Sequence, residues 1–509
     1  MTAEYFCPRP PDASRLMHLC RNTAVRRMLP GGSSCDRAPV DRTGSRALLI
    51  LLMFLSACSP RPYVKENLDL EQAPREFAAA RLDDDALGEA LRRLDPTAEW
   101  PPRILSPPRL GLLAALRSRE VREARAAILA AEAAREVAVQ RQNPLVSLGF
   151  ERHSLIDDNQ SGNWSIGPSV EFTLAPRGRR ALVAARAEVE VRRARLASLG
   201  AAWAARDAAT AAALELLAQR QLSARETAVK TASDEALSAA RASVAAGIAD
   251  PFEWQTLMLA ANESRLMRLT RMTQTAQAEA ALASALGLPA SSCAELQLAA
   301  TARGKVPPFQ ELQQHMLLHD PAVLGALAEF DAADRDLALA VHAQYPSVQL
   351  NPGYFFDQGD HVWSLLGGVV VPVLASQDSA IDSAEARRAM AREHVHAAQT
   401  GAIAALSEAH ARWRTSLEVR REARLIAADM QKHHAALVAK AAQGIVDELS
   451  VRRAAQQVEE MSVQLAMSDA AVRAARHALE SAARMPFDDP VFTHFLDELQ
   501  ATAVAQPEP

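Results

Sequence analysis

Two segments of the chain repeat one strand-forming pattern at a fixed separation. Each segment starts at a proline, Pro144 in the first and Pro346 in the second, and runs through a loop to a tryptophan. From that tryptophan on, the two segments align at a shift of 199 residues, and the aligned pairs are Trp164 and Trp363, Ile166 and Leu365, Val170 and Val369, and Phe172 and Val371. Alternating runs joined by a loop predict a β-hairpin in each copy. The chain must therefore fold with few strands, because the long Ala-rich stretches around the hairpins have a helical pattern.

The second predicted strand of the first copy alternates between apolar and polar residues. One face carries Trp164, Ile166, Val170, Phe172 and Leu174, and the other carries Ser165, Gly167, Ser169, Glu171 and Thr173. The strand before it matches, with Val146, Leu148 and Phe150 against Ser147, Gly149 and Glu151. This alternation over about 11 residues is typical of strands that cross a membrane. The alternative is a soluble sheet whose apolar face packs on helices.

Four strands are too few for a closed barrel in one chain. Open strand edges expose backbone groups that lipid cannot satisfy, so a membrane barrel built from these hairpins needs several chains. Three chains would supply 12 strands, a size at which a barrel can close.

Very long helices are expected around the hairpins. The predicted helices cover 108–142, about 70 residues from 177 to 246, 251–286, 309–344 with a kink at Asp320-Pro321, about 68 residues ending at Gln443, and a last helix ending near Arg484. A helix of about 70 residues is roughly 105 Å long. The two shorter helices of each copy together have nearly that length. Each copy is therefore predicted to be a rod two helices wide, with its hairpin at one end and a Gly turn at the other.

These signals divide the chain into six parts. They are a leader with a lipoprotein signal peptide (1–57), an extended segment (58–107), a first repeat (108–289), a linker (290–308), a second repeat (309–485) and a tail expected to be mobile (486–509).

The leader contains the pattern of an export signal. Arg42 and Arg46 precede an apolar run over 47–55, which is about half the length of a spanning helix. The run ends in Leu55-Ser56-Ala57-Cys58, which resembles a bacterial lipobox, so Cys58 is the predicted lipidated first residue of the mature chain. The alternative is an ordinary secretory signal with an incidental cysteine. Residues 1–41 fit no signal, which suggests a translation start assigned too far upstream, with Met28 as a candidate for the true start.

Composition and cysteine content limit the function further. The five cysteines are Cys7, Cys20, Cys35, Cys58 and Cys293. If the leader is removed and Cys58 is acylated, only Cys293 remains, and no internal disulfide can form. A net charge of −5 with 23% charged residues is not the profile of a nucleic-acid-binding protein. No run after the leader reaches 18 apolar residues, so no transmembrane helix is predicted.

The order and spacing of these elements resemble the TolC-type outer membrane efflux protein family, in its lipoprotein branch. The resemblance covers about residues 108–485, and with the lipobox it rests on Asn143-Pro144, Tyr345-Pro346 and Leu286-Gly287. It implies an α+β membrane protein: a homotrimer with a 12-stranded β-barrel, four strands per chain, continued by a long periplasmic α-helical barrel. It further implies an efflux or secretion channel in the outer membrane that works with a periplasmic adaptor protein and an inner-membrane transporter, without enzymatic activity or a cofactor.

Two Gly turns are the candidate functional elements. Gly247-Ile248-Ala249-Asp250 and Gly444-Ile445-Val446-Asp447 share a Gly-Ile-small-Asp pattern. Glycine permits the positive φ of a helix reversal, and aspartate can cap the next helix, so a structural explanation is sufficient. The resemblance implies in addition that the turns form a periplasmic tip where the adaptor docks, through Gly247, Ile248, Asp250, Gly444, Ile445 and Asp447.

The same resemblance places four acidic residues near the mouth of a channel. They are Asp250, Glu253, Asp447 and Glu448. Repeated around a threefold axis, they would form rings that favour cations. Where the family often carries a further acidic residue, this chain has Thr256 and Arg453.

No catalytic or metal-binding motif stands out. The sequence has no phosphate loop, nucleophile elbow or Cys-x-x-Cys. His315 and His319 have helical spacing for a shared metal, but two polar positions on a partly exposed helix explain them as well. The run Arg177-Gly178-Arg179-Arg180 follows a strand and faces either lipid headgroups or solvent. The alternative to a channel is a pore-less periplasmic helical scaffold or adaptor, which has no need for four strands with an apolar face.

Overall fold

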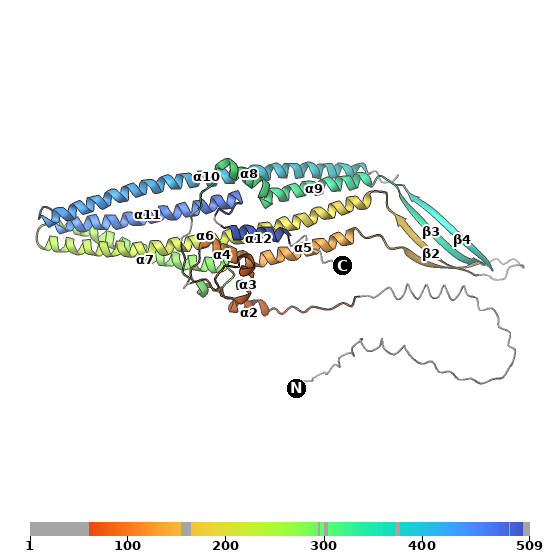
Figure 1. Cartoon of the computed structure of the whole chain (residues 1–509), viewed down its shortest axis with the longest axis horizontal. Coiled ribbons are helices and arrows are strands. Elements are labelled where there is room, and N and C mark those ends of the chain that lie inside the picture. Colours follow the sequence, from red (N-terminus) through yellow and green to blue (C-terminus); the bar gives the residue numbers. More distant parts are fainter. Residues whose placement is uncertain are drawn as a thin grey trace, which may run out of the picture. The chain divides into compact units, whose positions relative to one another are not determined.

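The computed structural model describes residues 61–153, 164–293, 296–299, 304–357, 359–371, 377–487 and 489–501. The leader, the signal segment and Cys58 lie outside these residues. The chain divides into two units, Met1–Asp69 and Leu70–Pro509. The described part of the first unit, residues 61–69, contains no helix or strand. The named helices and strands belong to the second unit (Figure 1).

Both predicted hairpins are present, and they join into one sheet. Its strands are β1 (Leu145–Arg152), β2 (Trp164–Leu174), β3 (Ser347–Asp357) and β4 (Asp360–Val370). The order is β1-β2-β3-β4, and every neighbouring pair is antiparallel. The two hairpins meet where β2 pairs with β3, so β1 and β4 form the edges.

The register of the sheet aligns most apolar residues of β1, β2 and β3 on one face, together with Trp363, Leu365 and Val369 of β4. Cross-strand neighbours on this face include Val146 with Val170, Leu174 with Val348, and Val348 with Val369. Because side chains alternate along a strand, the opposite face carries most polar and small residues of β1 and β2. It also carries Phe355 of β3 and three apolar residues of β4, Val362, Leu366 and Val370. There the ring of Phe355 lies against Gly167, where an added Cβ would come 2.0 Å from the Tyr354 carbonyl oxygen. The predicted alternation is confirmed for β1 and β2, whereas both faces of β4 carry apolar residues.

Four long helices extend from the sheet toward the Gly turns, as predicted. They are α6 (Arg179–Ala245, 67 residues), α7 (Pro251–Ala285, 35 residues), α10 (Asp378–Ala442, 65 residues) and α11 (Glu448–Ala483, 36 residues). At 1.5 Å per residue, α6 is about 100 Å long. Ala-rich sequence suits such lengths because alanine loses no side-chain entropy in a helix. None of the helices in the described residues is both long and apolar enough to cross a bilayer.

The shorter helices near the sheet differ in part from prediction. The expected continuous helix over 108–142 is instead two helices, α4 (Pro107–Arg117) and α5 (Arg119–Ala138). The break lies at Ser118, whose hydroxyl accepts a hydrogen bond from Val121 N at 3.2 Å and starts α5. In the second copy, α8 (Phe309–His319) and α9 (Pro321–His342) meet at the kink that was predicted, and Asp320 caps α9 by accepting from Ala322 N at 2.7 Å.

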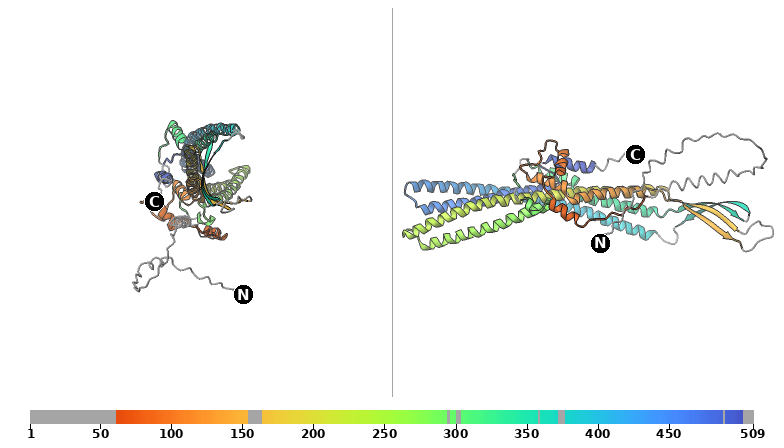
Figure 2. Two further views of the ribbon diagram at one scale, coloured as in Figure 1. Left: turned by 90° about the vertical axis from the view of Figure 1, so that its right-hand side faces the viewer. Right: turned by 90° about the horizontal axis from the view of Figure 1, so that it is seen from below.

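The helices form an open array one layer wide. In the half near the Gly turns, α7 packs on α6, α6 on α11 and α11 on α10. In the half near the sheet, α5 packs on α6, α6 on α9 and α9 on α10. Figure 2 shows the two helix pairs α6/α7 and α10/α11 running side by side toward their turns. The first copy therefore supplies one edge of the array, and the second copy supplies the other.

Short elements, here called the collar, pack against α4, α6 and α7 in the middle of the unit, where extended chain was expected. The segment 58–107 contains α2 (Gln72–Ala79) and α3 (Asp85–Leu94), and the tail contains α12 (Pro490–Ala501). The linker contains the short 3-10 helix η2 (Ala290–Cys293). Leu105 pairs with the linker, donating its N–H to the Gln297 carbonyl at 3.0 Å. The predictions of an extended segment and a mobile tail are therefore wrong for these stretches.

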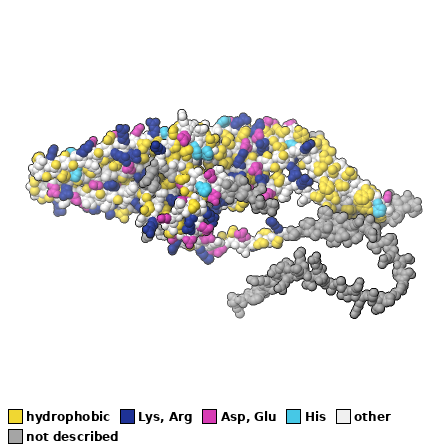
Figure 3. Space-filling view, in the orientation of Figure 1, with side chains coloured by type: hydrophobic (Ala, Val, Ile, Leu, Met, Phe, Trp, Pro, Cys, Tyr) yellow, Lys and Arg dark blue, Asp and Glu magenta, His cyan; other side chains and the backbone are white. Residues whose placement is uncertain are grey.

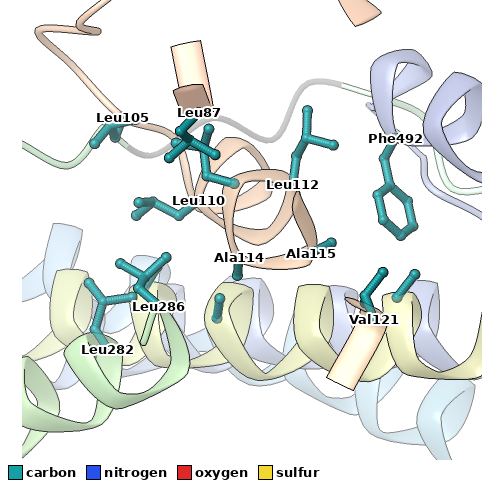
Figure 4. Close-up of a cluster of buried hydrophobic side chains, with 14 of the residues drawn as sticks. Leu87, Leu105, Leu110, Leu112, Ala114, Ala115, Val121, Leu282, Leu286 and Phe492 are labelled. Carbon is teal, nitrogen blue, oxygen red and sulfur yellow. The ribbon is translucent and has the colours of Figure 1, made fainter. Parts of the chain in front are cut away.

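Hydrophobic packing holds the collar on the rod. Leu87, Leu91 and Leu94 follow helical spacing along one face of α3 and are buried. Phe492 and Phe495 of α12 are fully buried in the same cluster. Figure 4 shows Leu282 of α7, Leu286 just beyond it and Phe492 of α12 around α4. In the sequence, these short helices are marked only by a stripe of apolar residues. They become stable when that stripe packs against the rest of the unit.

A buried cation joins the collar to the long helices. Arg206 of α6 is fully buried and pairs with Glu480 of α11, while its guanidinium carbon lies 4.7 Å from the ring centroid of Phe492. Asp489, just before α12, lies 3.8 Å from Arg206 Nε and accepts from Phe492 N at 3.1 Å. Burial raises the pKa of Asp489, and Arg206 only partly opposes that shift.

Candidate functional site

The two Gly turns have the same backbone geometry. Gly247 has a φ of +74° and Gly444 a φ of +73°. After each glycine, the isoleucine N–H reaches back over the end of the helix: Ile248 N to the Ser243 carbonyl at 2.9 Å, and Ile445 N to the Lys440 carbonyl at 3.0 Å. This is a common helix ending built on a left-handed residue.

Conformation, rather than space, requires glycine at both turns. A Cβ added to Gly247 or Gly444 would meet no atom within 4 Å. A β-branched side chain is nevertheless strained at positive φ. The prediction that these turns need φ above zero is confirmed.

The turns expose large apolar side chains at the tip of the unit. Ile248 is 75% exposed, Phe252 72% and Ile445 67%. Behind them, Leu257 of α7 and Leu449 of α11 are buried against Ala236 and Ala240 of α6. The tip therefore has a small core that fixes the two turns together, with an isoleucine from each turn left outside it.

The two aspartates of the shared pattern behave differently. Asp250 caps α7, because its carboxylate accepts from Phe252 N at 2.9 Å, as predicted. Asp447 stands at the same place before α11 but makes no side-chain hydrogen bond to the helix backbone. It accepts from the hydroxyl of Ser450 instead.

Two of the four acidic residues near the tip are paired with arginines of α11. Glu253 forms an ion pair with Arg453. Glu448 lies 3.3 Å from Arg452, which also reaches Glu235 of α6 at 2.7 Å. The pairing of Glu253 with Arg453 was not predicted, because α7 and α11 are about 200 positions apart in the sequence. Glu448 and Arg452 are four residues apart on α11, a spacing that the sequence does show. Asp250 and Asp447 are exposed and form no ion pair with another described residue. A ring at a channel mouth needs neighbouring chains, so the aperture stays a prediction.

The apolar face of the sheet is exposed over all four strands. Trp363 is 81% exposed, Leu365 74% and Val146 68%. Figure 3 shows hydrophobic side chains gathered over the sheet end, while charged side chains are scattered over the helices. Aromatic and basic groups meet at the far end of the strands: the Tyr354 and Trp363 ring centroids are 4.8 Å apart, and the Arg152 guanidinium carbon lies 5.5 Å from the Trp164 ring centroid.

His315 and His319 stack on each other, with ring centroids 4.1 Å apart. Each ring uses Nδ1 to donate to a backbone carbonyl, Ala483 at 3.1 Å and His315 at 2.9 Å respectively. Burial lowers the pKa of His315. Within the described ranges, no group of three or more His, Cys, Asp or Glu side chains is arranged to hold a metal ion.

Comparison with solved structures identifies the fold. A membrane protein from Pseudomonas aeruginosa is similar with a TM-score of 0.59 and 18% identity, covering 84% of this chain and all of that one. The outer-membrane channel OprN is similar with a TM-score of 0.61 and 13% identity, over 84% of this chain and 100% of that one. The CmeC outer membrane channel of Campylobacter jejuni gives 0.58 and 12%, over 87% and 98%. No family model and no curated protein sequence matches the chain.

The chain therefore has the fold of bacterial outer membrane channels. It is the fold that the resemblance to the TolC-type family implies, and the expected combination of long helices with a four-stranded sheet is confirmed.

Proposed function

We propose that the chain is the outer membrane channel of a tripartite efflux or secretion system. In this function it passes substrates from a periplasmic adaptor and an inner-membrane transporter to the exterior, and it catalyses no reaction. One observation carries the proposal. The sheet and the helix layer are both open, and in each of them the first repeat forms one edge and the second repeat forms the other.

The edges of the arrays point to a closed ring of several copies. At every level the first copy supplies one edge, through β1, α5 and α7, and the second copy supplies the other, through β4 and α10. A head-to-tail contact between such edges closes into a ring when the rotation is right. One rotation would then pair β1 with β4, and α7 with α10, of the next chain. A homotrimer, with 12 strands in all, is the ring that we propose.

Apolar residues along the two helical edges support this contact. On α7, Phe252, Leu259 and Leu266 are exposed at intervals of seven residues. On α10, Val419 and Ile426 repeat the same interval and are also exposed. A spacing of seven gives an apolar seam of the kind that packs one helix on another. Exposing both seams to water is unfavourable, whereas in a ring each seam would pack against the facing seam of the next chain.

The sheet supports a membrane barrel. Its longest strands have 11 residues, about 35 Å when extended. Tilted by about 40°, such strands span about 25 Å, the height of the apolar band on an outer-membrane barrel. The exposed apolar face would contact lipid, and the face of Ser165 and Gly167 would line the pore. A pore-less periplasmic scaffold would leave this apolar face in water, which disfavours that alternative.

The tip and the amino terminus complete the proposal. We place adaptor docking at Gly247, Ile248, Asp250, Gly444, Ile445 and Asp447, at the end of the unit opposite the sheet. We place a lipid anchor at Cys58, on the lipobox alone. The named channels OprN and CmeC lend support, because both are outer membrane channels with this fold.

Single-channel recording tests the proposed function. Purified full-length protein added to a planar lipid bilayer should produce stepwise, long-lived conductance. Ser169→Arg, on the face proposed to line the pore, should alter the conductance of each step without reducing their number. Protein that stays folded and gives no conductance at any concentration would overturn the proposal.

A further inference from the structure

A cleft lies where the sheet joins the helices. It occupies about 660 Å³ between the β2–α6 and α9–β3 connections. Its walls include Leu174 and Arg177 from the first connection, and His342, Tyr345 and Val348 from the second. The two copies of the repeat therefore build it together, at the end of the sheet that faces the helices.

One wall of the cleft continues the apolar face of the sheet. Leu174 and Val348 are cross-strand partners, and both belong to the apolar face that also carries Val369. Both are exposed, and the ring of Tyr345 beside them is 62% exposed. A hydrocarbon chain lying on the sheet could therefore enter the cleft without crossing a polar boundary.

A second part of the wall is cationic. Arg177 lines the cleft, and the run that contains it continues with Arg179 and Arg180. Arg180 donates to the Val139 carbonyl at 2.8 Å, whereas Arg177 and Arg179 form no ion pair with a described residue. No acidic side chain is among the residues that line the cleft.

A histidine fixes the basic connection in place. His342 Nε2 lies 3.0 Å from the Arg177 carbonyl, and because that oxygen can only accept, the nitrogen donates. Its Nδ1 is buried without a partner in the described structure. Gly178, with a φ of +96°, turns the chain directly after Arg177. The backbone that carries Arg177 is therefore held at the cleft by a side chain of the other repeat.

We propose that this cleft binds the headgroup of an anionic glycerophospholipid such as phosphatidylglycerol. The phosphodiester would pair with Arg177, and an acyl chain would lie along Leu174 and Val348. The proposal rests on the proposed function, because it needs the sheet face to lie in a bilayer. Basic pockets at a membrane surface attract anionic headgroups, and tyrosine prefers this interfacial depth. A free phosphate ion would leave the apolar wall unused, so lipid is the occupant that fits both walls.

Native mass spectrometry of the full chain in detergent tests the site. Dioleoyl phosphatidylglycerol should bind in preference to dioleoyl phosphatidylcholine, and excess inorganic phosphate should not displace it. Arg177→Gln should reduce the preference about fivefold, the equivalent of about 1 kcal/mol for one cation near an anionic surface. Arg225→Gln, an exposed arginine further along α6, is the matched control and should leave the preference unchanged.

Three results would overturn the site: equal binding of the two lipids, an equal loss in both variants, or displacement by inorganic phosphate. Conductance measured on the same preparations separates this failure from that of the proposed function. Normal conductance with no headgroup preference overturns the lipid site alone. A preparation that neither oligomerises nor conducts overturns both, since the sheet face would then meet no bilayer.

Discussion

The sheet and the helical tip lie at opposite ends of the unit, and both expose apolar side chains, but in different arrangements. On the sheet the register joins them into one face that extends over four strands. At the tip they are single residues, Ile248, Phe252 and Ile445, set among carboxylates and arginines. A continuous apolar face suits contact with fluid lipid chains, because they adapt to the surface and need no side chain at a fixed position. Isolated apolar residues within a charged surface suit a protein partner that must dock in one orientation.

The largest effect should come from charge placed on the continuous face. Leu365→Arg should destabilise the membrane-inserted protein by about 2–4 kcal/mol, because Leu365 is exposed in the middle of β4 and would lie near the bilayer midplane. Ser169→Arg is the control, because that residue belongs to the opposite face of the sheet. Unfolding of the two variants in lipid vesicles with urea measures the difference. If both arginines are tolerated equally, the two faces do not meet different solvents, and the comparison fails.

A smaller cost in stability, but a complete loss of transport, is expected at the tip. Gly444→Val should strain its turn by about 1–3 kcal/mol, because valine is unsuited to positive φ. The sheet is remote from this turn, so the variant should still insert and conduct. Cells carrying it should nevertheless be as sensitive to a panel of toxic compounds as cells that lack the protein.

The matched control for that variant is Gly401→Val, within α10, where a Cβ would meet no atom within 4 Å and the backbone is helical. Normal transport by Gly444→Val would show that the turn is only a connection. It would then have no part in docking.

The ion pairs of the tip should have little effect on stability. Arg453→Gln removes the partner of Glu253, and since both side chains are partly exposed the cost should be about 0.2–1 kcal/mol. The released carboxylate should raise the preference of the channel for cations over anions, measured as a shift in reversal potential under a salt gradient. Arg225→Gln, away from the tip, should cause no shift. An unchanged reversal potential in Arg453→Gln would mean that Glu253 faces away from the pore.

The collar between the two ends should respond to pH. The folded-state pKa of Asp489 is raised above its ordinary value of 3.8 by burial. Its contribution to stability is therefore fully present below that ordinary value and is lost as the pH rises through the folded pKa. Amide hydrogens of α12, corrected for intrinsic exchange, should be better protected near pH 4 than near pH 7. Asp489→Asn should remove this difference while keeping the cap on Phe492, and an unchanged pH dependence would assign it to another group.

The contrast between the two ends also explains what could be predicted from the sequence. The hairpins, the long helices and the Gly turns have local signals: a period of two, Ala-rich runs, and glycine before aspartate. The kink at Asp320 was predictable because Pro321 follows it, whereas the equivalent break at Ser118 has no proline. Helix α12 was missed because Phe492 and Phe495 are stabilised by packing on residues hundreds of positions away. The pairing of Glu253 with Arg453 was missed for the same reason.

We propose that the open arrays of one chain close only with further copies, and the mass of the detergent-solubilised full-length protein decides whether they do. A closed trimer should give a mass of three chains, free of detergent and lipid contributions, that persists on dilution. A mass of one chain with a folded helical circular dichroism spectrum would contradict it, because the sheet edges and both helical seams would then be stable without a neighbour.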